Sequence, residues 1–367
     1  MLIEIDISVV DSASKGELNS VRALQSIATS QSYGYHVVWA QRKTLQKIVT
    51  LSTLSTHDNS IFRSILNKFS TITSDYKKIG FRMLVSTLLT TKIEYNQIII
   101  NPNQYPEFNY VNRTQLLAEN LLDINLFRYI GLFFLRECKL ENTINLEFDD
   151  ELGGGDTTHT KYKKYVDRAE KLCLCILDGD REFDDKNATY GETFKKVQKC
   201  HNSSKPFNCL CYGTEKIREI ENLIPNYLYM TDTNYQHTQI VKEQLKFDFS
   251  YFDLKEGLKC KSITDHNILS YWRNTLVAYK NIIQNIDAAI SFMNTDINEY
   301  KRVYEKEVFI EGFGANLLKY IINSKKSELE KITANELTNS QAHEWNRIGK
   351  LMVYWGCAVT IPKIPLT

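Results

Sequence analysis

The sequence predicts an α/β protein: a central parallel sheet flanked by helices, with an N-terminal α/β region and a mostly helical C-terminal region. Between residues 111 and 228, short apolar runs alternate with stretches of helical spacing. A similar alternation fills residues 1–110, whereas residues 229–367 have mostly helix-like spacing. The chain has 367 residues, of which 43% are hydrophobic. That length is enough for two domains or three small ones, and we expect divisions near residues 110 and 228.

Composition narrows the class of protein. The 45 Lys and Arg residues nearly balance 44 Asp and Glu residues, so no global basic field indicates a polyanionic partner. A local basic face can still coexist with an acidic metal site. The eight cysteines are typical of reduced core residues in a cytoplasmic protein. Because we find neither a signal-peptide pattern nor an apolar run long enough to span a bilayer, we expect a cytoplasmic protein without membrane segments.

The N-terminal region, residues 1–110, has a role that the sequence does not identify. We expect strands at 2–10 and 35–40, a helix through 21–27, another around 45–54, and helical structure across 61–89. Asp6 lies on the first strand, where a PIN-like nuclease would place an acid, but we favour a strand cap or a solvent-facing residue. The segment 101–110 holds two of the six prolines and reads as a connection between domains.

The central region, residues 111–228, carries the informative pattern. Its expected strands are 113–118, 144–148, 171–177 and 207–212, and helices are expected at 121–135, 162–170 and 190–200. Gly153, Gly154 and Gly155 form the only glycine cluster of the chain and permit a tight turn into the second helix. Asp156 or Thr157 would then be the N-cap of that helix.

Acidic residues follow the most apolar of these strands. The run Leu172–Leu177 is continuous, as in a strand buried on both faces, and Asp178 and Asp180 come directly after it. Ligands of open α/β sheets bind at the carboxyl ends of strands. Two neighbouring carboxylates raise each other's pKa unless a cation neutralises them, and Mg²⁺ is the obvious candidate.

Further acids follow neighbouring strands. Glu119 comes after the strand at 113–118, and Glu219 and Glu221 come after the strand at 207–212. The carboxyl ends of parallel strands meet at one edge of a sheet, so we expect these side chains to converge with the two aspartates. Two divalent ions held by such carboxylates would activate a water and hold a scissile phosphate. The pattern therefore indicates phosphoryl-transfer chemistry.

The order and spacing of these motifs resemble the TOPRIM domain, in particular the OLD-like nuclease branch of bacterial anti-phage systems. The resemblance covers roughly a third of the chain, and its motifs are LLAENLLD around Glu119, GGGDTTHTKYKKY at 153–165, ILDGDREFDD around Asp178, and REIENLIP at 218–225. This chain departs from the family in having Asn120 where many members have glycine after the catalytic Glu. Asp123 stands at the offset where the family often has a further acid, but we favour a solvent-facing or capping role for it.

The resemblance implies a nuclease that cleaves phosphodiesters of DNA or RNA with Mg²⁺ or Mn²⁺, in a two-ion site. By resemblance the catalytic residues are Glu119, Asp178, Asp180 and Glu221, the metal ligands are these four with Glu219, and the phosphate contacts are Arg181, Lys163 and Lys164. No Walker A motif is present. An ATPase or sensor would therefore be a separate subunit or absent, and a homo-oligomer stays open.

Other classes of protein remain in view. A strand-terminal DxD also grips Mn²⁺ and a diphosphate in nucleotide-sugar glycosyltransferases, which would not require Glu119. A haloacid-dehalogenase-type phosphatase normally has Thr or Val where this chain has Arg181. A non-catalytic binding subunit with a degenerate site is the third alternative. The pairs Cys173-x-Cys175 and Cys209-x-Cys211 could suggest zinc, but alternate positions on two adjacent buried strands explain them at least as well.

Overall fold

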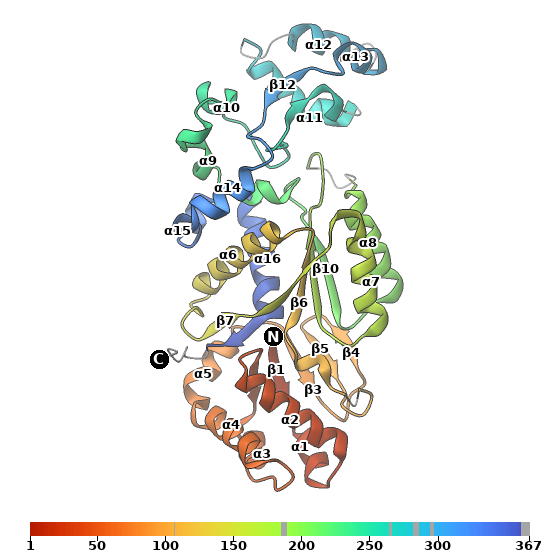
Figure 1. Ribbon diagram of the computed structural model, residues 1–367, viewed down its shortest axis with the longest axis vertical. Coiled ribbons are helices and arrows are strands. Elements are labelled where there is room, and N and C mark those ends of the chain that lie inside the picture. Colours follow the sequence, from red (N-terminus) through yellow and green to blue (C-terminus); the bar gives the residue numbers. More distant parts are fainter. Residues whose placement is uncertain (106, 185–188, 264–265, 282–285, 294–296, 361–367) are drawn as a thin grey trace. The chain divides into compact units, whose positions relative to one another are not determined.

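The described residues form two compact units of an α/β protein, which confirms the predicted fold class. The computed structural model describes residues 1–105, 107–184, 189–263, 266–281, 286–293 and 297–360 (Figure 1). The first unit comprises the described residues of Met1–Ile176, Lys195–Tyr212 and Asn346–Thr367, and the second those of Leu177–Phe194 and Gly213–Trp345. The three-part division expected near residues 110 and 228 stays a prediction.

The first unit begins with a five-stranded sheet in the order β2-β1-β3-β5-β4. Its strands are β1 (Leu2–Ile5), β2 (Val37–Ala40), β3 (Arg82–Val85), β4 (Lys92–Glu94) and β5 (Gln97–Ile100). Neighbouring strands run parallel except β4, which forms an antiparallel hairpin with β5. The helices of this region are α1 (Ile7–Ser14), α2 (Leu18–Ser32), α3 (Arg42–Ile48), α4 (Thr56–Asn67) and α5 (Phe69–Tyr76).

Three sequence expectations for this region are wrong in their bounds, and the helix expected around 45–54 is α3, which ends at Ile48. The strand predicted over 2–10 ends at Ile5, because Asp6 is the N-cap of α1 and its carboxylate accepts a hydrogen bond from the Ser8 N–H. The helical structure predicted over 61–89 ends at Tyr76, and β3 follows it. In β3 every second side chain is buried, which is the pattern of a strand. Over only four residues, this alternation cannot be distinguished in the sequence from the spacing of a helix.

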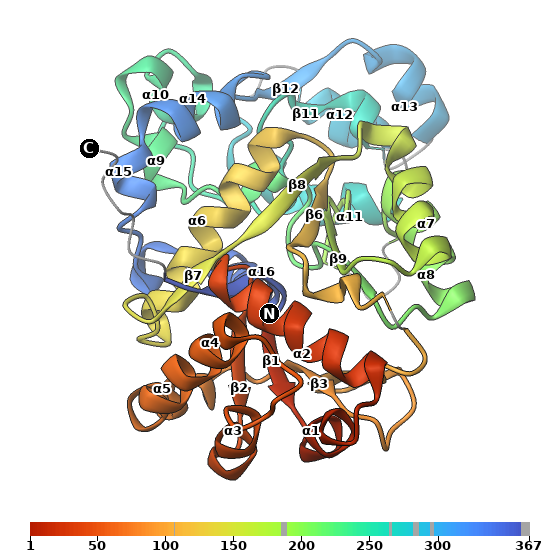
Figure 2. The same cartoon turned by 60° about the horizontal axis from the view of Figure 1, so that its bottom comes forward.

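The second sheet of this unit has the order β10-β9-β6-β8. Its strands are β6 (Thr114–Ala118), β8 (Phe148–Leu152), β9 (Cys173–Leu177) and β10 (Cys209–Gly213), and β6 runs parallel to both β8 and β9. Figures 1 and 2 show α7 (Thr158–Arg168) and α8 (Glu192–Ser204) on one face, with α6 (Leu121–Glu137) and α16 (Asn339–Gly356) on the other. Every residue of β6 and β9 is buried, as the continuous apolar runs predict.

The strand predicted over 144–148 is instead divided between two strands. β7 (Ile144–Leu146) pairs antiparallel with β13 (Cys357–Val359), outside the parallel sheet. The parallel neighbour of β6 is β8, which begins only at Phe148 and reads FDDEL. Because β8 lies at the sheet edge, it tolerates charged side chains that an interior strand would exclude.

The second unit is mostly helical. It contains the antiparallel pair β11 (Gly257–Lys259) and β12 (Val308–Glu311), and the helices α9 (Tyr227–Met230), α10 (Gln239–Lys242), α11 (His266–Ala278), α12 (Ile286–Met293), α13 (Ile297–Tyr304), α14 (Leu317–Ser324) and α15 (Lys326–Leu329). The buried side chains of Phe249, Phe252 and Trp272 form an aromatic cluster with the half-buried Phe247. Within the described ranges, the structure has no helix with the length and apolarity required to span a membrane.

Candidate carboxylate site

The turn after β9 is hydrogen-bonded to the segment that carries the second acidic pair. Asp178 follows β9 directly, and its Oδ1 accepts a hydrogen bond from the Ile220 N–H at 2.6 Å. The Asp180 N–H donates to the Arg218 carbonyl oxygen at 2.9 Å. Asp180 itself has φ of 50°, in the left-handed region where Asp and Asn are the best-tolerated non-glycine residues. The DxD turn and the segment 218–220 thus form one local structure.

Gly179, between the two aspartates, is required by close packing. Its N–H donates to Thr214 Oγ1 at 2.7 Å. An added Cβ at this position would clash with the Thr214 carbonyl oxygen, which is backbone and has little freedom to move. Only glycine therefore lets the turn lie this close to the residues that follow β10.

Glu219 and Glu221 approach a common cation although they lie two residues apart. Glu219 is in extended conformation and precedes the short 3₁₀ helix Ile220–Leu223, which contains Glu221. Both glutamates are buried, each with 8% of its surface exposed. Lys255 Nζ lies 3.4 Å from Glu219 Oε2 and 3.3 Å from Glu221 Oε2. The change of backbone conformation after Glu219 allows both side chains to face the same ammonium group.

Asn222 anchors this acidic segment. Its side-chain oxygen accepts a hydrogen bond from the Glu219 N–H at 2.8 Å, closing a capping box. Its amide nitrogen donates to the carbonyl oxygens of Phe249 and Phe252, at 2.7 and 2.8 Å. The buried amide therefore fixes the two glutamates against the aromatic core of the second unit.

Lys255 is a functional candidate that the sequence did not reveal. Asp253 Oδ1 accepts hydrogen bonds from the N–H groups of Lys255 and Glu256, at 3.0 and 2.6 Å, so an Asx turn presents the lysine. Arg218 lies 3.6 Å from Asp253 and 3.7 Å from Glu219. The only sequence signal was the compact stretch YFDLKEG, residues 251–257.

The electrostatics of the cluster follow from burial and from an excess of acid. Burial raises the pKa of Glu219 to about 7, against the opposing influence of Lys255. Desolvation likewise raises the pKa of Asp180, and Arg218 and Lys255 oppose the rise. Burial alone lowers the pKa of Lys255, but Glu221, Glu219 and Asp178 outweigh it and the pKa is raised. Asp178, Glu219 and Glu221 thus interact electrostatically with the same cation, Lys255.

In this part of the described chain, five carboxylates face two cationic side chains. The acids are Asp178, Asp180, Glu219, Glu221 and Asp253, and the cations are Arg218 and Lys255. Glu219 Oε2 is buried without a hydrogen-bond partner. Among the described residues, no three His, Cys, Asp or Glu side chains are already arranged as ligands of one ion. The oxygen-rich donor set nevertheless fits the preference of Mg²⁺ and Mn²⁺.

Glu119 belongs to the first unit, where it follows β6 and is half-buried. Its carbonyl oxygen accepts a hydrogen bond from the Gly154 N–H at 3.1 Å, so the glycine turn lies against the end of β6. Gly154 and Gly155 have φ of 75° and 63°, which confirms that this turn requires glycine. Thr157 is the N-cap residue of α7, although its side chain makes no capping hydrogen bond.

Asn120 and Asp123 form a capping box at the start of α6. The Asn120 side chain accepts hydrogen bonds from Leu122 and Asp123, and the Asp123 carboxylate accepts one from the Asn120 N–H at 3.2 Å. The capping role favoured for Asp123 is therefore confirmed. The departure from the family pattern at position 120 has a local explanation, because asparagine is a strong N-cap and glycine a weaker one.

The three phosphate-binding candidates lie in different surroundings. Arg181 donates to the Glu215 carbonyl oxygen at 2.7 Å and lies over the ring of Tyr190, with its guanidinium carbon 5.7 Å from the ring centroid. Lys163 and Lys164 are exposed on α7 in the first unit, and Lys163 forms an ion pair with Asp167. Only Arg181 belongs to the same unit as the carboxylate cluster.

Five of the eight cysteines are buried, as expected of core residues, whereas Cys138, Cys200 and Cys211 are half-buried. All eight are free thiols. Cys173 and Cys175 alternate along β9, and Cys209 and Cys211 alternate along its neighbour β10. Cys173, Cys175 and Cys209 are fully buried, so the paired spacing reflects two adjacent strands.

No protein-family model matches the chain, and searches of curated proteins and of solved structures return no match.

Proposed function

We propose that this protein is a metal-dependent, TOPRIM-type endonuclease that cleaves nucleic acid phosphodiesters as an effector of a bacterial anti-phage system. The observation that carries the proposal is the hydrogen bond from the Ile220 N–H to Asp178 Oδ1. It joins the DxD turn to the segment bearing Glu219 and Glu221, which is the coupling that a shared metal site requires. A DxD glycosyltransferase would not need the second segment.

The proposed metal ligands are Asp178, Asp180, Glu219 and Glu221, together with Glu119. Mg²⁺ or Mn²⁺, in a pair of ions, would supply an activated water and neutralise charge on the phosphate. The excess of carboxylates over Arg218 and Lys255 supports this assignment, since a cluster with net negative charge gains stability when cations bind.

The roles of general base and of phosphate contact are assigned to the charged side chains around the proposed metal site. Glu119 is proposed as a ligand or as the general base toward water. Burial raises the pKa of Glu219 to about 7 in the metal-free protein, and bound cations would favour its carboxylate form. Lys255 stabilises the carboxylates before ions bind and is then available to the phosphate. Arg181, Lys163 and Lys164 are proposed to contact phosphates of the strand.

The same proposal covers the setting in which the protein acts. We expect a cytoplasmic protein whose partner is its nucleic acid substrate. A separate ATPase or sensor subunit and self-association are the further partners that the family resemblance suggests.

The test combines cleavage with direct metal binding. Purified protein is incubated with plasmid, single-stranded DNA and total tRNA in Mg²⁺, Mn²⁺ or EDTA, beside Glu119→Ala, Asp178→Ala and the exposed control Glu243→Ala. We expect metal-dependent cutting that both site variants lose and the control keeps. Mn²⁺ binding, followed by electron paramagnetic resonance, should weaken in Asp178→Ala even if cutting needs an absent trigger. Cutting by both site variants at the wild-type rate would exclude this site.

A further inference from the structure

A second candidate site lies within the first unit, between the β4–β5 hairpin and the C-terminal half of α16. It is a cavity of about 310 Å³, at the lower end of the roughly 300–1,000 Å³ typical of small-molecule sites. Its lining combines Phe81 and the hairpin residue Tyr95 with Arg347, Lys350 and Tyr354 of α16. None of these residues belongs to the carboxylate cluster, so the nuclease proposal leaves the cavity unexplained.

Aromatic rings form one wall of the cavity. Phe81 stacks against Tyr354 with ring centroids 5.8 Å apart and planes 13° from parallel, and it stacks similarly against Trp355. Phe81 and Trp355 are buried, whereas Tyr354 is only half-buried. Tyr95, in the turn of the hairpin, has its side chain fully exposed at 101%. The accessible ring surface is therefore that of Tyr354 and Tyr95.

Gly80 contributes to this wall by having no side chain. An added Cβ at position 80 would clash with the Tyr354 hydroxyl group, so glycine lets that ring lie directly against the backbone before β3. The half-buried position of Tyr354 is thus determined by its close contact with the backbone at Gly80.

The cationic side chains of Arg347 and Lys350 also line the cavity, beside Tyr354. Arg347, Lys350 and Tyr354 follow one another at spacings of three and four residues, and therefore share a face of α16. The Arg347 guanidinium lies 5.6 Å from the centroid of the Tyr212 ring, and Lys350 Nζ lies 5.4 Å from that of Tyr354. Within the described part of the chain, neither cation has a carboxylate at ion-pair distance. Both remain able to meet an anion.

The ligand chemistry follows from this combination. A flat aromatic ligand would stack on the exposed rings, and a phosphate attached to it would meet Arg347 and Lys350. Asn96 and Glu94 of the hairpin add polar groups that can read the edge of a base. A proline-rich peptide would also stack on aromatic rings, but it brings no negative charge for the two cations.

We propose that this cavity binds an unpaired nucleobase together with its phosphate. The base comes from a single-stranded nucleic acid or from a free nucleotide. A duplex is excluded because its bases are already stacked and paired. The proposal does not rest on the nuclease activity, and either can fail without the other.

The test measures binding of fluorescein-labelled six-nucleotide strands, oligo(dT) and oligo(U), by fluorescence anisotropy in EDTA, where metal-dependent cleavage does not occur. Tyr95→Ala should weaken binding between about fivefold and a hundredfold, as expected for one lost base stack. The matched control is Tyr33→Ala, which removes another exposed tyrosine of the same unit. The double variant Arg347→Gln/Lys350→Gln should flatten the dependence of log K on log salt by roughly 1–1.5. Its control is Arg42→Gln/Lys43→Gln on α3, which should leave the slope unchanged.

Competition separates the two sources of the ligand. If AMP or UMP displaces the labelled strand as well as longer unlabelled strands do, the ligand is a free nucleotide. If displacement strengthens with strand length, the ligand is a single strand. The exposed control Glu243→Ala should bind the strands like wild type. The proposal is overturned if the strands do not bind, if both cavity variants bind like wild type, or if duplex or a proline-rich peptide competes better than single strands.

Discussion

The two sheets of the first unit place an acid at the same topological position and use it differently. Asp6 follows β1 and caps α1 through its hydrogen bond to Ser8 at 3.0 Å. Glu119 follows β6, but the cap of α6 is the next residue, Asn120. Asp6 is itself the N-cap of its helix, whereas in the second sheet the N-cap lies one residue after Glu119. Helix capping therefore accounts for Asp6, whereas the cap of α6 is supplied by the residue after Glu119.

The largest effect is expected on metal-dependent cleavage, when the acid that follows β6 and the acid that follows β1 are each replaced by the corresponding amide. Glu119→Gln should lower metal-dependent cleavage by at least about a hundredfold, because it removes a proposed ligand or base. Asp6→Asn should leave the cleavage rate unchanged, since an amide oxygen can still cap α1. Initial rates of plasmid nicking measure both. Equal losses in the two variants would remove the distinction between the sheets.

A second prediction concerns the pH dependence of stability at the carboxylate cluster. Burial raises the pKa of Glu219 to about 7 in the folded protein, so between pH 4.5 and 7 the native state binds more protons than the unfolded state. Stability should therefore fall as pH rises through this window, by up to roughly 3 kcal/mol. Urea unfolding at pH 5 and pH 8 measures it, and Glu219→Gln should reduce the loss.

Mg²⁺ provides the matching control. Ions bound by the cluster favour the carboxylate form, so added Mg²⁺ should recover stability at pH 8 more than at pH 5. The exposed Glu243→Gln variant should behave like wild type in all four conditions. A Glu219→Gln variant with an unaltered pH profile would argue against a raised pKa at this position.

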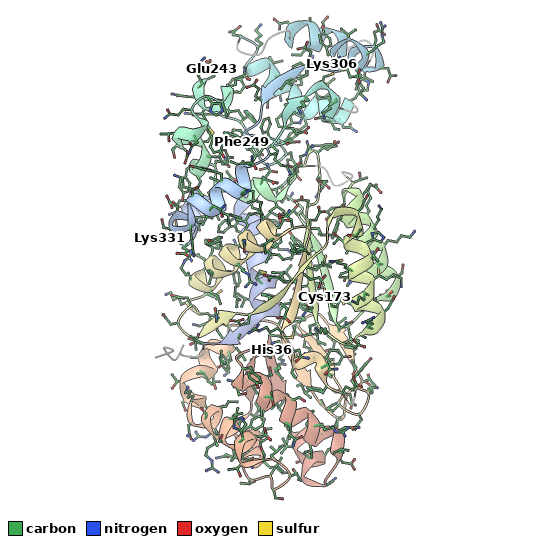
Figure 3. All side chains as sticks on the ribbon, in the orientation of Figure 1. His36, Cys173, Glu243, Phe249, Lys306 and Lys331 are labelled. Carbon is green, nitrogen blue, oxygen red and sulfur yellow. The ribbon has the colours of Figure 1, made fainter. Side chains whose placement is uncertain are left out.

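The opposite dependence is expected in the first unit, at His36. Its imidazole is fully buried, with Nδ1 at 2.9 Å from the Met1 amino group and Nε2 at 2.8 Å from the Asn112 carbonyl oxygen (Figure 3). Burial lowers the pKa of His36 well below its ordinary value, so the unfolded state binds the additional proton in acid. Stability should fall as pH drops below about 6.5, by at most about 1.4 kcal/mol per pH unit.

His36→Gln sharpens this result, because an amide can accept from Met1 and donate to Asn112 without titrating. We expect the variant to lose less stability than wild type between pH 7 and pH 5, as followed by circular dichroism during urea unfolding. A wild-type acid profile in the variant would assign the acid sensitivity to other groups.

The smallest expected effect returns to the two helix caps. Asp6→Ala and Asn120→Ala should each destabilise the protein by about 1 kcal/mol, the usual loss for a cap replaced by alanine. This corresponds to a fall in melting temperature of roughly 2–4 °C. Differential scanning fluorimetry would detect both. An unchanged melting temperature in Asp6→Ala would contradict the explanation that capping of α1 by Asp6 ends β1 at Ile5.

The comparison also shows which elements were predictable. The interior strands β6 and β9 are continuous apolar runs, and their position in the sequence anticipated the structure to within two residues. The edge strand β8 was missed, because it carries acids that are tolerated only where one side of a strand lacks a neighbour. The hairpin of β4 and β5 was missed as well, since β4 is exposed along its whole length.

In the candidate site, local order was readable and long-range pairing was not. The positions of Asp178 and Glu221 after strands follow from local patterns. The hydrogen bond between Asp178 and Ile220, 42 residues apart, depends on how the chain returns. Lys255 had no motif to mark it, because its place between Glu219 and Glu221 results from an Asx turn and a buried core.

The sequence by itself determined the α/β class, the buried strands and the acids that follow them, because burial on both faces imposes a continuous apolar pattern. Only the tertiary structure decided which acids share Lys255 and how a hairpin and α16 enclose an aromatic, cationic cavity. Those outcomes depend on contacts between residues far apart in the chain. The alternation and spacing of apolar residues indicate local secondary structure and do not reveal such contacts. The desolvation and the charge interactions of a side chain depend on which groups the fold brings next to it.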